Sequence, residues 1–213
     1  RYSFLLSPRL PLRYNTNRGE EMNLQAILVS NGFGVALMIM LLVSARNRIW
    51  TRQPSERMFF SLIWATMALC SLEALSFCID GRQFAAARPI NIVLNVALFS
   101  VNISSAFLWT QYVDSRLFDD RTRIRRRAPL LAVPAAVIIC LSAASAFTPV
   151  LFYVSADNVY SRTPLTALPF VVSLFYLLYA EAEIYLNRNN AKNYLVLPSI
   201  IFLMPIFVGS ALQ

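Results

Sequence analysis

Residues 90–113 read INIVLNVALFSVNISSAFLWTQYV, a run of 24 residues without a charged side chain. The hydrocarbon core of a bilayer is about 30 Å thick, and a helix crosses it in about 20 residues. Inside lipid, backbone N–H and C=O groups must bond within the segment, so a spanning run of this kind is a helix. The stretch therefore predicts a transmembrane helix.

Runs of this kind recur along the whole chain. It has 213 residues, of which 57% are hydrophobic and 14% charged, a composition too apolar for an ordinary soluble domain. We expect an all-α fold, a polytopic membrane helix bundle whose spans and loops use nearly every residue and leave no room for a soluble domain. The six predicted spans are 24–45, 58–79, 90–113, 130–153, 167–186 and 194–213.

Basic residues concentrate in the loops on one side of the predicted bundle. Loops 46–57, 114–129 and 187–193 hold twelve Lys and Arg residues, whereas loops 80–89 and 154–166 hold three. Cytoplasmic loops of membrane proteins carry an excess of basic residues. We therefore expect the three basic loops to be cytoplasmic and the N-terminus to be external.

The two ends of the chain carry separate expectations. Residues 1–21 contain two prolines and scattered arginines, and Arg18 to Met22 can be encoded by a purine-rich run ending in ATG, as in a bacterial ribosome-binding site. We expect Met22 to be the true start, residues 1–21 to be a translated leader or a disordered tail, and residues 22–213 to form the bundle. Six spans that begin outside place Gln213 outside, so we also expect a truncated seven-span module.

Several kinds of chemistry lack their residues in this sequence. It contains no histidine, and its cysteines, Cys70, Cys78 and Cys140, lie inside predicted spans without a CxxC pair. It also lacks a glycine-rich phosphate loop, GxSxG and HExxH motifs, and paired carboxylates suited to phosphoryl transfer. Its basic residues mark loops rather than one folded face. We therefore predict no catalytic residue, no metal site, no cofactor and no nucleic-acid partner for this chain.

Carboxylates inside predicted spans are candidate functional residues, because a charged group in lipid is unfavourable. Glu73 lies about two turns from the external end of its span, and helical spacing places Phe77 and Asp80 on the same face. Glu181 and Glu183 lie near the cytoplasmic end of a later span. We expect these two to pair with arginines of the preceding basic loop or to extend toward the membrane surface.

Asparagines line one face of the following span, because Asn91, Asn95 and Asn102 recur at helical spacing. Two interpretations remain open for them and for Glu73. In the first, the amides bridge helices, and Glu73 is protonated or paired with an arginine of loop 80–89.

In the second interpretation, the same residues form the floor and rim of an outward-facing ligand pocket, and the external loop 157–164 supplies its lid. The candidate ligand-binding residues of this hypothesis are Glu73, Asp80, Arg82, Arg88, Asn91, Asn95, Asp157, Asn158, Tyr160 and Arg162.

Three strings in the sequence resemble those of a known class of membrane region. They are LEALSFCIDGR at 72–82, LWTQYVD at 108–114 and DNVYSRTPL at 157–165. Together they resemble the multi-span input region that precedes GGDEF domains in bacterial diguanylate cyclases. The resemblance implies a seven-span sensor, a cytoplasmic domain that makes cyclic di-GMP from two GTP, and a homodimer formed through that domain. The seventh span and a GGDEF string are absent here, so the resemblance supplies no catalytic residue.

These observations favour a sensory input module in the bacterial cytoplasmic membrane. We expect a small-molecule or lipid-borne signal to favour one packing of the bundle, so that its cytoplasmic ends shift an attached diguanylate cyclase. A small multi-span transporter or permease component is the alternative, and a membrane enzyme that uses Glu73 is a third hypothesis.

Overall fold

The structure is a computed structural model that describes residues 16–44, 54–118 and 121–187. Its five long helices contain segments of 20 to 31 residues that are long and apolar enough to cross a membrane. The sixth predicted span, 194–213, lies outside the described residues. The helices are α1 (Thr16–Ser44), α2 (Pro54–Ile79), α3 (Ala87–Leu117), α4 (Arg121–Ala144) and α5 (Ala167–Leu186).

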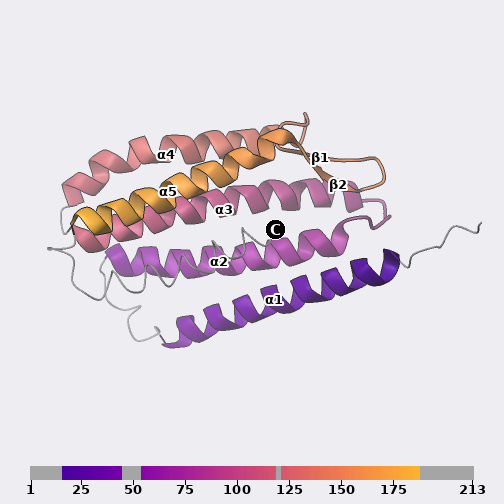
Figure 1. The fold of residues 1–213 in the computed structure, drawn as a ribbon, viewed down its shortest axis with the longest axis horizontal. Helices are drawn as coiled ribbons and strands as arrows, with labels where there is room; N and C mark the ends of the chain where they lie inside the picture. Colours follow the sequence, from indigo (N-terminus) through magenta and orange to yellow (C-terminus); the bar gives the residue numbers. More distant parts are fainter. Residues whose placement is uncertain (1–15, 45–53, 119–120, 188–213) are drawn as a thin grey trace, which may run out of the picture.

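Helix α3 is the centre of the bundle. It packs against α2, α4 and α5, while α1 lies along the far side of α2 (Figure 1). Gly34 allows α1 to approach α2 closely, because a Cβ atom at this position would lie 3.1 Å from the Cys70 Sγ atom. Large apolar side chains face outward, such as Val29 at 72% exposure and Met40 at 69%. This surface suits lipid as its solvent.

The main core cluster joins α3, α4 and α5 around Tyr176, which is fully buried with Ile103 and Ile138. Pro134 lies in the middle of α4 and has no N–H to donate to the preceding turn. Next to this gap, the Tyr176 hydroxyl accepts a hydrogen bond from the Ala135 N–H at 3.0 Å and donates one to the Leu131 carbonyl. A side chain of α5 thus bridges two backbone groups of α4.

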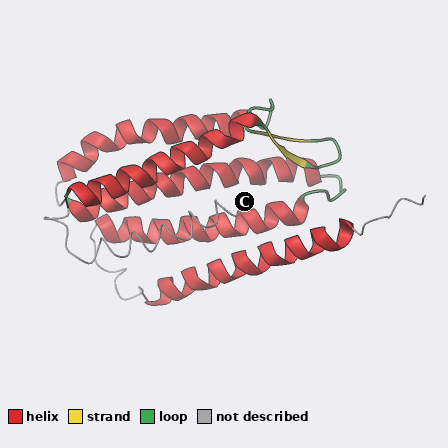
Figure 2. Cartoon of the chain, in the orientation of Figure 1, coloured by secondary structure: helices red, strands yellow, loops and turns green. Residues whose placement is uncertain are grey.

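The all-α expectation is confirmed, and the one addition is a short antiparallel hairpin that connects α4 to α5 in the described part of the chain. Strand β1 (Phe152–Val154) pairs with β2 (Tyr160–Arg162), and both lie at one end of the bundle (Figure 2). The short 3-10 helix η2 (Pro164–Thr166) then leads into α5. The Phe152 ring stacks on Phe99 of α3 with ring centroids 5.7 Å apart, and this contact fixes the hairpin over α3.

The predicted fourth span, 130–153, begins inside α4 but is wrong at its end, where the chain has left the helix and entered β1. Helix α4 begins nine residues earlier, at Arg121, and ends at Ala144. Pro149 disfavours helical geometry at the residue before it, so the chain turns and then enters β1.

The other predicted spans agree more closely with the helices. Spans 58–79 and 90–113 lie inside α2 and α3, and 167–186 has the bounds of α5. The described part of the first span lies inside α1. Because α1 begins at Thr16, helix also includes the last residues of the predicted tail, whose earlier part lies outside the described residues.

Candidate ligand-binding site

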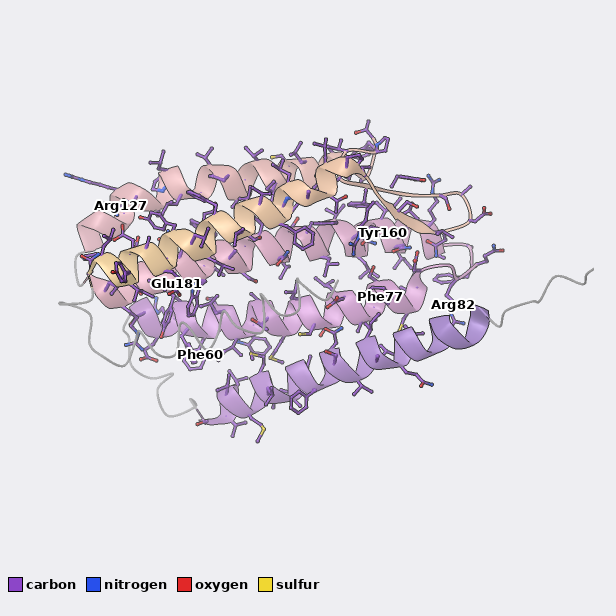
Figure 3. All side chains as sticks on the ribbon, viewed as in Figure 1. Phe60, Phe77, Arg82, Arg127, Tyr160 and Glu181 are labelled. Carbon is purple, nitrogen blue, oxygen red and sulfur yellow. The ribbon has the colours of Figure 1, made fainter. Side chains whose placement is uncertain are left out.

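The two ends of the bundle differ in composition. We name the hairpin end after β1 and β2; it also contains the α2–α3 turn. The arginine end contains the junction of α3 and α4 and the end of α5. Phe77, Arg82 and Tyr160 lie toward the hairpin end, whereas Arg127 and Glu181 lie toward the opposite end (Figure 3).

A cavity of about 280 Å³ lies among α2, α3, the hairpin and the start of α5. Its volume is near the lower limit for small-molecule sites. Five of the ten predicted ligand-binding residues line it, namely Glu73, Asp80, Asn95, Tyr160 and Arg162. The other lining residues are Leu69, Ser76, Phe77, Leu98, Phe99, Asn102, Thr166 and Phe170.

Glu73 is the carboxylate of this cavity that has no bonding partner in the described part of the chain. It lies on α2, and among the described residues no group forms a hydrogen bond or an ion pair with it. The proposed pairing with Arg82 or Arg88 does not occur. Arg88 instead donates from Nε to the Val154 carbonyl at 3.3 Å, which ties the start of α3 to β1.

Asn91 and Asn158 form a buried network beside the cavity. The Asn91 Nδ2 atom donates to the Asn158 Oδ1 atom and to the Asp80 Oδ1 atom, each at 3.1 Å. The Asn91 Oδ1 atom accepts from Asn95 Nδ2 at 2.8 Å. Asn91 is 0% exposed, so its amide is committed to the protein rather than to a ligand. The packing interpretation therefore describes Asn91 better than the pocket hypothesis does.

Asn158 fixes the hairpin tip to the α2–α3 turn. Its Nδ2 atom donates to the Ile79 carbonyl at 2.7 Å and to the Arg82 carbonyl at 2.9 Å. Its φ of 59° lies in the left-handed region, where asparagine is enriched. Gly81, with a φ of 70°, donates its N–H to the Asn158 carbonyl at 2.8 Å. Two residues with left-handed backbone thus meet where the two turns join.

Asp80 connects this network to the cavity. Its Oδ1 atom accepts from Asn91 and from the Tyr160 backbone N–H, the latter at 2.8 Å. Burial raises the pKa of the Tyr160 phenol, and the neighbouring Arg162 guanidinium acts in the opposite direction. The phenol therefore keeps its proton at neutral pH and can donate a hydrogen bond.

Four more of the predicted ligand-binding residues lie outside the cavity, at the tip of the hairpin end. Arg82, Arg88, Asp157 and Asn158 line a second hollow of about 370 Å³ at the tip of the hairpin end. The structure therefore divides the predicted set between two hollows, with Asn91 buried between them. It does not form one continuous pocket from all ten residues.

The arginine end holds a different kind of polar cluster. Glu183 forms an ion pair with Arg127 at 2.7 Å and also accepts from the Tyr179 hydroxyl at 3.2 Å. This pair confirms the prediction that Glu183 binds an arginine of loop 114–129. The same prediction is wrong for Glu181, because its buried Oε1 atom has no hydrogen-bond partner among the described residues.

Sequence reasoning placed Phe77 on the face of Glu73 but missed Phe99 and Phe170, which also line the cavity. Phe170 belongs to the predicted span 167–186, and nothing in its sequence context places it in the same cavity as Glu73. Asn102 was recognised as part of the polar face of α3 but was left out of the ligand set, although it lines the cavity. The described residues contain no group of three or more Cys, Asp or Glu side chains arranged to hold a metal ion.

No protein-family model matches this chain, and no curated protein or solved structure is significantly similar to it. The resemblance to GGDEF-associated input regions therefore stays a prediction.

Proposed function

We propose that this chain is the membrane-embedded input module of a bacterial signalling protein, and that the cavity at its hairpin end is the ligand site. The observation that carries the proposal is the Glu73 carboxylate, which has no partner among the described residues and lies in the wall of a cavity at the hairpin end, opposite the arginine end. By the positive-inside rule the arginine end faces the cytoplasm, so the cavity faces outward.

Helix α3 provides a physical connection between the two ends. Phe99 lies in the cavity wall and stacks on the hairpin, and further along α3 the Thr110 hydroxyl donates to the Tyr176 carbonyl of α5 at 3.3 Å. A ligand that binds one arrangement of α2, α3 and α5 more tightly shifts the population toward it. The shift would then reach the cytoplasmic ends of these helices.

The proposed output is a cytoplasmic diguanylate cyclase, with dimerisation through that domain, as the resemblance implies. We expect the genomic reading frame to continue past Gln213 through one further span into a GGDEF domain. A stop codon soon after Gln213 would contradict this part of the proposal.

The signalling step can be tested without knowing the ligand. The Leu98→Trp substitution fills part of the cavity from α3, and Val93→Trp is its matched control because Val93 is 65% exposed on the same helix. Spin labels at Arg57→Cys on α2 and Leu186→Cys on α5 then report the distance between the two helices at the arginine end, in protein reconstituted in nanodiscs.

We expect Leu98→Trp, but not Val93→Trp, to shift the distance distribution by about 1–2 Å, the scale of helix shifts in switching proteins. Identical distributions for the parent protein and Leu98→Trp would contradict the sensor. Uptake of a solute into liposomes that requires Glu73 would replace the sensor with the transporter hypothesis.

A further inference from the structure

We propose that the cavity binds a small organic cation, in which an ammonium group pairs with Glu73 and an apolar body packs among aromatic side chains. This inference rests on the proposed function, because it names the ligand class of the same cavity.

The first argument is charge. Asp80 already accepts two hydrogen bonds from the protein at Oδ1, whereas Glu73 makes none with the described residues. Arg162 lies in the hairpin. Arg162 lowers the pKa of the Tyr160 phenol and Asp80 raises it, so these two opposite charges lie in the same part of the wall. The carboxylate of Glu73 is left as the charge that a ligand can neutralise, and an unpaired carboxylate at this depth favours a cationic partner.

The second argument is the shape and chemistry of the wall around Glu73. The cavity is lined by three phenylalanines from three different helices: Phe77 from α2, Phe99 from α3 and Phe170 from α5. Aromatic faces attract an ammonium group through their quadrupole and also pack against hydrocarbon. A hydrated inorganic cation would gain little from such a wall, whereas an organic amine uses both of its properties.

The third argument is a second polar group with free hydrogen-bonding capacity. Asn102 lines the cavity from α3, and its amide forms no hydrogen bond with the described residues. A primary ammonium group has three N–H donors, and the Glu73 carboxylate and the Asn102 carbonyl oxygen are acceptors for them. The volume of about 280 Å³ restricts the ligand to a small molecule.

The test compares three probes of similar shape and different charge: 2-phenylethylamine, 2-phenylethanol and 3-phenylpropionate. Binding is measured by isothermal titration calorimetry on the full chain in nanodiscs. We expect the amine to bind most tightly and Glu73→Gln to weaken it by about tenfold to a hundredfold, the value of a hydrogen-bonded charge. Glu56→Gln, the same change at the other end of α2, is the matched control and should leave the affinity unchanged.

The outcomes separate this inference from the proposed function. Tightest binding of the alcohol or the carboxylate, abolished by Leu98→Trp, would overturn the cationic ligand while keeping the cavity as a ligand site. Equal affinity of the amine for the parent protein and Glu73→Gln would also overturn it. No binding of any probe at millimolar concentration would count against both the ligand class and the ligand site.

Discussion

Two carboxylates at opposite ends of the bundle, Glu183 and Glu73, have opposite surroundings. At the arginine end, Glu183 pairs with Arg127 at 2.7 Å, and its Oε2 atom also accepts from Asn187 Nδ2 at 3.2 Å. At the hairpin end, Glu73 lines a cavity and forms no such bond with the described residues. The difference indicates different roles for the two carboxylates: Glu183 joins α5 to α4, while Glu73 faces a cavity, where we propose that it meets a ligand.

The polar groups around Glu73 sharpen this contrast. Asp80 lines the cavity and accepts from Asn91, which in turn donates to Asn158, so this part of the wall is held by hydrogen bonds within the protein. A hydrogen-bonded wall beside a carboxylate that has no partner among the described residues suits the proposed binding site, because binding groups need to be held in place before the ligand arrives.

The largest effect is expected where the hairpin is fixed to the α2–α3 turn. Asn158→Ala removes three hydrogen bonds and leaves the Ile79 and Arg82 carbonyls without this donor. We expect the free energy of unfolding to fall by about 3 kcal/mol, since unsatisfied buried groups each cost about 1–3 kcal/mol. Unfolding by SDS in mixed micelles measures it. The control is Asp157→Ala, at the exposed residue next to Asn158. Equal losses of unfolding free energy for the two variants would contradict a stabilising role for the Asn158 hydrogen bonds.

The next effect is expected in the middle of the bundle, between the two ends. Tyr176→Phe removes the hydroxyl that bridges the Ala135 N–H and the Leu131 carbonyl next to Pro134. We expect a loss of about 2 kcal/mol in the same unfolding measurement, because two buried backbone groups lose their partner. Tyr153→Phe, in the exposed face of β1, should change it little. An unchanged free energy of unfolding for Tyr176→Phe would show that the Ala135 N–H and the Leu131 carbonyl find partners within α4 when the hydroxyl is absent.

The smallest effects separate the two carboxylates directly. Glu183→Gln weakens an ion pair whose Arg127 side chain is 44% exposed, so we expect a loss of about 0.5 kcal/mol. Glu73→Gln should leave the free energy of unfolding unchanged or raise it, since a charge without a partner is removed. A loss for Glu73→Gln larger than that for Glu183→Gln would mean that Glu73 is a packing residue.

The sequence predicted the parts of this fold that depend on local pattern. Apolar runs located the five described helices, and helical spacing placed Glu73 and Asp80 on one face, where both line the cavity. The end of α4 was missed because Pro149 was read within an apolar run, where a proline can bend a span or end it.

The site needed contacts that no local pattern contains. Tyr160 reaches Asp80 across 80 positions of the sequence, and this contact depends on a hairpin that an apolar run concealed. Asn91 was assigned to the ligand set because it shares a face with Asn95. The structure shows that Asn158 occupies its amide, which spacing along a single helix cannot reveal.

The most direct test of the account is the side of the membrane on which each end of the bundle lies. Single cysteines are introduced as Ala156→Cys at the hairpin end and Arg126→Cys at the arginine end, both exposed positions, in a variant whose native cysteines are replaced by serine. A membrane-impermeant maleimide is then added to intact cells. We predict labelling of Ala156→Cys in intact cells and of Arg126→Cys only after lysis, whereas the reverse pattern would contradict the outward cavity and the sensor built on it.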